Sequence, residues 1–215
     1  MGITVWRRRG TAAEGPDEAR ESSAPDAGPD WSTLIAGIEG CQRCPLHATR
    51  NRAVPGVGDR SARLMIIGEA PGAEEDRRGE PFVGRAGQLL DAMLAAMGLD
   101  RHQGVFITNV VKSRPPENRD PKAAEIDACR PWLDAQLDLV RPAVILAVGR
   151  VAAQSLTGSS RTIGKLRNQW HAFGDNGIPL RATYHPAYLL RRPAAKANAW
   201  DDLVTLKRYL REVTP

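Results

Sequence analysis

The chain has 215 residues, of which 42% are hydrophobic and 26% charged, a composition typical of a globular domain with an apolar core. No apolar run approaches the roughly 18 residues that a transmembrane helix needs, and no apolar stretch follows the basic N-terminal residues, so we expect neither a membrane span nor a secretory signal. Residues 1–30 hold four arginines against six acidic residues, so residues 31–215 carry a net charge of +7, which favours a polyanionic partner.

Seven of the first 30 residues are Gly or Pro, and only a few are large and apolar. Such a segment cannot bury enough surface to offset the entropy lost on ordering. We therefore expect a disordered tail over residues 1–30 and a single folded domain over residues 31–215.

Short apolar runs then alternate with segments of helical periodicity. The predicted strands cover 63–67, 105–111, 143–148 and 180–184. The predicted helices cover 87–97, 123–140, 151–156 and 195–210. Within the second of these helices, Pro131 should produce a kink or begin a new helix. Alternation of this kind predicts a parallel sheet with helices on both faces.

A polar loop follows each predicted strand, and parallel sheets place their sites beyond the carboxyl ends of the strands. The first loop, GEAPG (68–72), is not followed by the Lys and Ser/Thr of a phosphate-binding loop, which disfavours an ATP site. We therefore expect no nucleotide cofactor. The chain also lacks a nucleophile elbow, which disfavours a hydrolase of that type.

Three residues in these loops each allow two interpretations. Phe82 is either a core residue or a surface on which a ring stacks. Asn109 either caps backbone groups or pairs with an amide edge such as that of a pyrimidine. His185 is either structural or a hydrogen-bond donor to a developing anion.

Basic residues cluster beside the same loops, and they form either an ordinary solvated surface or a track for a nucleic-acid backbone. They are Lys112, Arg114, Arg119, Arg161, Lys165, Arg167, Arg191, Arg192 and Lys196.

Three long motifs, at 68–90, 108–121 and 185–191, together with CQRC (41–44) and Cys129, resemble the uracil-DNA glycosylase superfamily. The resemblance is greatest to family 4, the iron–sulfur enzymes of bacteria and archaea, and covers about residues 31–212. It implies a three-layer α/β/α sandwich with a central four-stranded parallel sheet. It also implies hydrolysis of the bond between uracil and deoxyribose in DNA, to leave an abasic site for base excision repair.

The resemblance assigns roles to the residues of the pocket. Phe82 would stack on the extruded uracil, Asn109 would read its amide edge, and His185 would lie near uracil O2, where the leaving anion gathers charge. Gly68 and Ala70 would also contact the substrate. Tyr188, Leu189, Leu190 and Arg191 would form the loop pressed into the minor groove. From the basic clusters, we expect Lys165 and Arg167 to bind DNA as well.

The residue that activates water is less well defined. The best-known relatives carry a carboxylate at the position of Ala70, which cannot act as a base. Glu69, Glu75 and Asn118 remain as candidates to position water or to stabilise the sugar cation, because electrostatic stabilisation can outweigh a strong base in a largely dissociative cleavage.

Family 4 holds a [4Fe–4S] cluster with four cysteines, and Cys41, Cys44 and Cys129 match three of them. Ser113 occupies the fourth position. A serine alkoxide, a water or a three-iron cluster could complete the site, or it could be empty or bind zinc. Three buried thiols without a metal are the further alternative.

The sequence therefore predicts a cytoplasmic, monomeric DNA-repair glycosylase acting on single- or double-stranded uracil-containing DNA. The alternative is a noncatalytic nucleic-acid-binding protein on the same fold.

Overall fold

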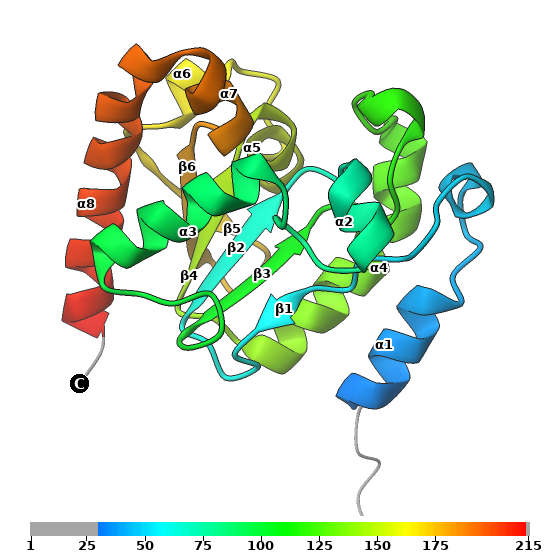
Figure 1. Cartoon of the computed structure of the whole chain (residues 1–215). Coiled ribbons are helices and arrows are strands. Elements are labelled where there is room, and N and C mark those ends of the chain that lie inside the picture. The colour runs from blue at the N-terminus through cyan, green and yellow to red at the C-terminus, as the bar shows by residue number, and fades with distance from the viewer. Residues whose placement is uncertain (1–29, 214–215) are drawn as a thin grey trace, which may run out of the picture.

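Residues 30–213 are described by the computed structural model, so the tail expected over residues 1–30 lies outside the described residues except for Asp30. The described chain forms a sheet with the strand order β1-β3-β2-β4-β6-β5, covered by helices (Figure 1). The strands are β1 Val57–Gly58, β2 Leu64–Gly68, β3 Val105–Asn109, β4 Val144–Val148, β5 Trp170–Phe173 and β6 Ile178–Thr183. The predicted α/β class is confirmed.

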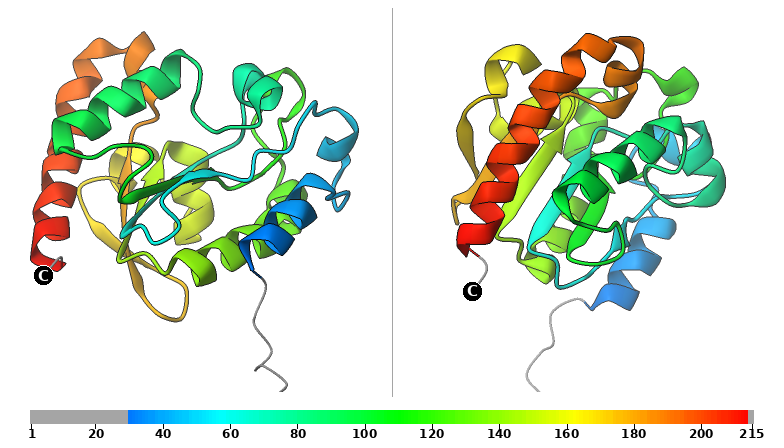
Figure 2. Two further views of the ribbon diagram at one scale, coloured as in Figure 1. Left: turned by 60° about the horizontal axis from the view of Figure 1, so that its bottom comes forward. Right: turned by 60° about the vertical axis from the view of Figure 1, so that its left-hand side comes forward.

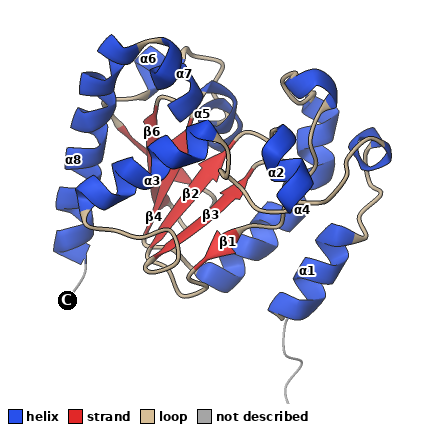
Figure 3. Ribbon diagram, in the orientation of Figure 1, coloured by secondary structure: helices blue, strands red, loops and turns tan. Residues whose placement is uncertain are grey.

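The sheet has six strands rather than the four expected. Its strands lie at the centre of the molecule, between the helices (Figure 3). The four inner strands, β3, β2, β4 and β6, are parallel, as predicted. The additional strands β1 and β5 pair antiparallel at the two edges. Neither strand has a recognisable sequence pattern, because β1 has two residues and β5 buries only Phe173.

Two helical layers enclose this sheet. The helices are α1 Trp31–Glu39, α2 Ala73–Arg78, α3 Arg85–Met97, α4 Ala123–Val140, α5 Arg150–Thr157, α6 Ile163–Leu166, α7 Pro186–Arg191 and α8 Lys196–Val213. Short 3-10 turns lie at Pro45–Ala48, Pro116–Asn118 and Pro193–Ala195. The helices α3, α7 and α8 pack on one face of the sheet, while α4, α5 and α6 pack on the other (Figure 2). Pro131 lies inside α4, which continues through it as one helix, so it does not start a new one.

Alternation along the inner strands explains why both layers are needed. In β2, Leu64 and Ile66 join the core under α3 and α8, whereas Met65 and Ile67 join the core under α4 and α5. All four are fully buried. Each such side chain contributes about 1.5–3 kcal/mol when it leaves water, so burial on both faces stabilises the sheet.

No helix within residues 30–213 is long and apolar enough to cross a membrane.

Candidate functional site

A cavity of about 480 Å³ lies beyond the carboxyl ends of β2, β3 and β6. The sequence-predicted residues that line it are Glu69, Ala70, Glu75, Phe82, Asn109, Asn118, His185 and Arg191. Gly68 lies directly beneath it, against Asn109 and Phe82. The carboxyl ends of the parallel strands thus bring together residues that are up to 122 positions apart in the sequence. We call this cavity the strand-end pocket.

Asn109 ends β3 and is 1% exposed. Its Oδ1 atom is buried and has no hydrogen-bond partner within residues 30–213. A Cβ atom on Gly68 would lie 2.4 Å from that oxygen, so only glycine allows the amide to sit at the end of the neighbouring strand. A buried acceptor without a donor costs about 1–3 kcal/mol, which a ligand N–H can recover.

Phe82 is held in a conformation that few residues other than glycine adopt, with φ at 54°. Arg101 donates to its carbonyl at 2.6 Å, and a Cβ atom on Gly87 would overlap that carbonyl at 1.7 Å. The ring stacks against His185, with centroids 5.6 Å apart and planes at 29°. The backbone around Phe82 therefore fixes one wall of the pocket.

His185 caps α7 with its side chain, because Nδ1 accepts from the backbone N–H of Ala187 at 3.1 Å. A neutral ring with an accepting Nδ1 carries its proton on Nε2. Burial, together with the charge of Arg191, lowers the pKa of His185 to about 4. The imidazole is therefore neutral at physiological pH and offers a single N–H donor.

The two candidate carboxylates differ in their surroundings. Glu75 accepts backbone N–H groups from Gly72, Val83 and Gly84 at 2.9–3.1 Å, so both of its oxygens anchor the loop around Phe82. Glu69 has a carboxyl neighbour instead. Burial and the hydrogen-bonded carboxyl group of Asp120 raise the pKa of Glu69 to about 7.

Arg150, the first residue of α5, forms an ion pair with Asp120. Its positive charge lowers the pKa of Glu69, against the effect of Asp120. Asn118, the third candidate, is exposed and lies at φ 55°, where its Oδ1 accepts from Arg114 at 2.8 Å.

The predicted DNA-binding residues fall into two groups. Tyr188 and Leu190 are 38% and 37% exposed on α7, and Lys165 and Arg191 are also exposed. Arg167 is buried instead and pairs with Asp202 at 3.0 Å. Leu189 is buried too, in the core under α3 and α8. The prediction that these two contact DNA is therefore not carried further: Arg167 packs α6 on α8, and Leu189 packs α7 on the sheet.

A second, much smaller cavity of about 10 Å³ brings Cys41, Cys44, Cys129 and Ser113 together, and we call it the cysteine cavity. Trp132 donates to Cys41 Sγ at 3.2 Å, and the Lys112 backbone N–H donates to Cys129 Sγ at 3.3 Å. Arg50 donates to Ser113 Oγ at 2.8 Å. Within residues 30–213, no three His, Cys, Asp or Glu side chains are arranged around the position of a single metal ion.

Lys112 connects this cavity to the strand-end pocket. Its fully buried ammonium group donates to Asn109 O and Gln136 Oε1 at 2.6 Å and to Thr108 Oγ1 at 2.7 Å. Burial lowers the pKa of Lys112 to about 7.

A family model described as the uracil DNA glycosylase superfamily matches residues 55–204, a range that contains the whole strand-end pocket. A type-4 uracil-DNA glycosylase of Archaeoglobus fulgidus is 45% identical over 179 residues, which cover 79% of this chain and 87% of that relative. A type-4 enzyme of Pyrobaculum aerophilum is 43% identical over 180 residues, which cover 81% of this chain and 91% of that relative.

The chain belongs to the uracil-DNA glycosylase superfamily. A type-5 uracil-DNA glycosylase of Thermus thermophilus is 35% identical over 190 residues, which cover 73% of this chain and 86% of that relative. Identity to both type-4 relatives is thus greater, as the sequence motifs implied, and the predicted family is confirmed.

Sequence reasoning missed three residues that shape this glycosylase pocket. Asp120 and Arg150 act on Glu69, and Arg101 holds the loop of Phe82. Asp120 and Arg150 follow β3 and β4, so their positions at strand ends were a usable signal. Arg101 lies before β3, at the opposite end of a strand, and no sequence pattern connects it to residue 82.

Proposed function

We propose that this protein is a uracil-DNA glycosylase that hydrolyses the bond between uracil N1 and deoxyribose C1′. The observation that carries the proposal is the buried, unpaired Oδ1 of Asn109 at the end of a pocket walled by Phe82 and His185. Membership of the superfamily and 41–45% identity to several type-4 uracil-DNA glycosylases support it.

The proposed reading of the base follows from the geometry of one amide. Asn109 Oδ1 would accept the N3–H of uracil, and the amide nitrogen would donate to O4. Cytosine has an acceptor at N3 and a donor at position 4, so the same orientation of Asn109 would reject it. The ring of Phe82 would stack on the base, after the base has been flipped from the duplex at a cost of about a few kcal/mol.

His185 is placed to stabilise the leaving group. When the glycosidic bond breaks, its electron pair stays with uracil, and negative charge gathers on N1 and O2. The neutral imidazole would donate its Nε2–H toward O2, because Nδ1 is engaged with Ala187. The uracil anion then takes a proton from solvent.

Water must add to C1′ on the opposite side of the broken bond. Of the candidate groups, Glu69 is the one whose carboxylate is not already bound to backbone N–H groups, and a pKa near 7 suits a general base. In the proposed step the water oxygen bonds to C1′ and its proton passes to the Glu69 carboxylate. Glu75 is assigned to the loop instead, and Asn118 can orient the water or the sugar cation.

DNA would approach over α7. Tyr188 and Leu190 are exposed there and could enter the space left by the flipped base, while Arg191 and Lys165 could contact phosphates. Ala70, at the rim of the pocket, and Gly68 beneath it leave room for the base. We propose a monomer acting on uracil in single- or double-stranded DNA, and such a substrate favours the cytoplasm as its location.

We also propose that the cysteine cavity binds an iron–sulfur cluster through Cys41, Cys44 and Cys129. Thiols that receive N–H donors, as Cys41 and Cys129 do, are typical of cluster ligands. Ser113, with its hydroxyl bound by Arg50, is a poor fourth ligand, and the cavity is small. A bound cluster would act by holding the surrounding loops, and we expect it to be labile.

The decisive experiment is incubation of the purified protein with an oligonucleotide that carries one uracil, followed by alkaline cleavage of abasic sites. We expect strand breaks at uracil, in the presence of EDTA as well, since the proposed hydrolysis uses no dissociable ion. In the same assay Asn109→Asp should reduce discrimination between uracil and cytosine. A protein that binds DNA without forming abasic sites on single or double strands would instead support the noncatalytic alternative.

A further inference from the structure

A third cavity, of about 610 Å³, lies at the other end of α2 from the strand-end pocket. Three arginines line it, Arg50, Arg52 and Arg78, beside one carboxylate, Glu39. His47, Asn51, Ala53 and Gly79 complete the lining. Excluding the histidine, the side chains of this basic cavity carry a net charge of +2. None of them has a role in base recognition or cleavage.

A buried carboxylate builds the wall of the basic cavity. Asp76 of α2 is fully buried, and its oxygens accept from the backbone N–H of Asn51 at 2.9 Å, from the Asn51 amide nitrogen at 2.5 Å and from the backbone N–H of Arg52 at 3.4 Å. These bonds fix the segment around Arg52 to the helix that carries Arg78. The backbone that carries Arg52 is therefore fixed to α2, while the side chains of Arg52 and Arg78 are exposed.

The three guanidinium groups are not equally engaged. Arg50 donates to Ser113 Oγ and, at 2.5 Å, to the carbonyl of Glu39, so it is part of the framework. Arg78 lies 3.7 Å from Glu74, whose closer partner is Arg77 at 2.7 Å. Within residues 30–213, no hydrogen bond or ion pair is recorded for the Arg52 guanidinium group. Arg52 and Arg78 thus remain available to an anion.

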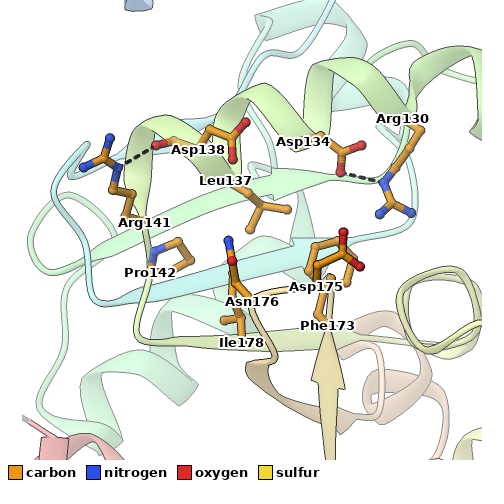
Figure 4. Close-up of a pocket in the computed structure, with 11 residues that line it drawn as sticks. Arg130, Asp134, Leu137, Asp138, Arg141, Pro142, Phe173, Asp175, Asn176 and Ile178 are labelled. Atoms are coloured by element: carbon orange, nitrogen blue, oxygen red, sulfur yellow. Dashed lines mark hydrogen bonds and ion pairs between the residues drawn. The ribbon is translucent and has the colours of Figure 1, made fainter.

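Another cavity, of about 730 Å³, provides a contrast (Figure 4). It also contains two arginines, but Arg130 pairs with Asp134 at 2.6 Å, and Arg141 donates to the carbonyl of Asp138. Three aspartates line it, Asp134, Asp138 and Asp175, so its net charge is negative. A large volume alone therefore does not select an anion, whereas the charge of the basic cavity does.

The length of α2 sets the spacing between the two sites. Gly72 and Glu75, at the start of the helix, line the strand-end pocket, and Arg78, at its end, lines the basic cavity. Six residues of α-helix span about 9 Å. A single DNA strand whose uracil occupies the strand-end pocket can therefore reach the basic cavity within a few nucleotides.

We propose that the basic cavity is a phosphate subsite, in which Arg52 and Arg78 bind the backbone of the DNA strand within a few nucleotides of the uracil in the strand-end pocket. The inference rests on the proposed function for the position of the uracil. Guanidinium groups bind phosphate oxygens with paired N–H donors, which gives the contact direction as well as charge. The subsite would hold the strand on the side of the pocket away from α7.

The test measures how DNA affinity depends on salt. Arg52→Gln, Arg78→Gln and the double variant are compared with the unaltered protein on a labelled duplex carrying a stable abasic-site analogue, between 50 and 200 mM salt. We expect each lost phosphate contact to lower the log–log salt slope by about 0.9 and the double variant to lower it by about twice that amount. The rate of uracil release at saturating DNA should not change.

Arg208→Gln is the matched control, since it removes the same charge from an exposed position near the far end of α8. Its slope should stay that of the unaltered protein. Duplexes shortened to one nucleotide on either side of the lesion then locate the contact, because the effect of the two variants should vanish on one side only. The proposal would be overturned if Arg52→Gln, Arg78→Gln and the double variant all kept the slope of the unaltered protein. An effect that survives both truncations would also overturn it.

Two further measurements separate this proposal from others. The same slopes are measured on an undamaged duplex, where a backbone contact should persist even if the protein released no uracil, so the subsite and the glycosylase activity can fail independently. Inorganic phosphate is added in a thermal unfolding assay. Stabilisation that Arg52→Gln abolishes, with all DNA slopes equal, would identify a site for a free anion and refute a backbone contact.

Discussion

The strand-end pocket and the cysteine cavity differ in which of their polar atoms already have partners. In the strand-end pocket one buried acceptor, Asn109 Oδ1, is left without a donor, although its neighbours are firmly held. In the cysteine cavity, Cys41, Cys129 and Ser113 each already receive an N–H donor. The unpaired Asn109 oxygen, which lines an open cavity, fits a ligand that comes and goes, whereas the donors already bound in the cysteine cavity fit a structural role.

The largest effect is expected for His185, which lines the strand-end pocket. His185→Ala removes the proposed donor to uracil O2 and should slow single-turnover uracil release by about 2.7–4 kcal/mol, or roughly 10²–10³-fold. DNA affinity should change little. His102→Ala, at an exposed position, is the control. An unaltered rate would show that the stacked imidazole only caps α7.

Gly68 tests whether the unpaired oxygen must keep its position. In Gly68→Ala the new Cβ atom would lie 2.4 Å from Asn109 Oδ1 and 2.6 Å from Phe82, so both walls must move. Overpacking of this kind costs about 1–3 kcal/mol, and we expect roughly a 10- to 100-fold loss in uracil release.

Gly164→Ala, whose nearest neighbour would be Tyr184 Oη at 3.9 Å, should retain full activity. Similar kinetics for the two glycine variants would contradict the proposed pocket.

A substitution of Asp120 tests whether Glu69 is the general base. With a pKa near 7, Glu69 is largely protonated below that pH and ionised above it, so uracil release should rise through pH 7 if the carboxylate accepts the water proton. Asp120→Asn removes a charge that raises this pKa. In this variant the pH at which uracil release rises should be lower. The rate at pH 6 should therefore increase by up to about tenfold.

Arg150→Gln should move the rise in the opposite direction, because Arg150 lowers the pKa of Glu69. Carboxyl NMR titration of Glu69 provides a second readout that does not depend on turnover. Identical pH profiles in both variants would exclude Glu69 as the base.

The smallest effect is expected at the cysteine cavity. Ser113→Cys supplies the missing thiolate, and tenfold tighter retention of iron would add about 1.4 kcal/mol to the stability of the loaded protein. For a domain of this size that raises Tm by about 3–6 °C. Iron and sulfide content and visible absorption, measured on anaerobic preparations, check this.

Cys129→Ala should have the opposite effect and favour unfolding. If neither variant altered iron content or Tm, the three cysteines would be remnants without a cluster.

The sequence predicted the parts of the fold that depend on local pattern. The bounds of the four inner strands and of α8 were predicted to within three residues, and those of α4 without deviation, because each element buries a regular set of apolar positions. β5 was missed since its pairing with β6 depends on a neighbouring strand rather than on its own alternation. The positions of Asn109 and His185 at or just after strand ends were predicted because the apolar pattern of each strand shows where it stops.

Contacts between distant residues were beyond the sequence. Lys165 and Arg167 are both basic and two positions apart, yet one is exposed and the other pairs with a buried carboxylate 35 residues away. Similarly, the sequence alone does not distinguish the roles of Glu69 and Glu75, which are both glutamates that follow β2. Only the folded loop shows that one accepts three backbone N–H groups and the other faces Asp120.

Lys112 has a practical consequence for work with this protein. Its side chain holds the carbonyl of Asn109, and its backbone N–H holds the sulfur of Cys129. The Cys129 thiol itself is buried and its pKa is raised, but loss in air of a cluster bound to it would displace residue 112 and, through it, the amide that distinguishes uracil from cytosine. Preparations exposed to oxygen should therefore lose fidelity before they lose solubility, so discrimination between the two bases is a more sensitive quality control than yield.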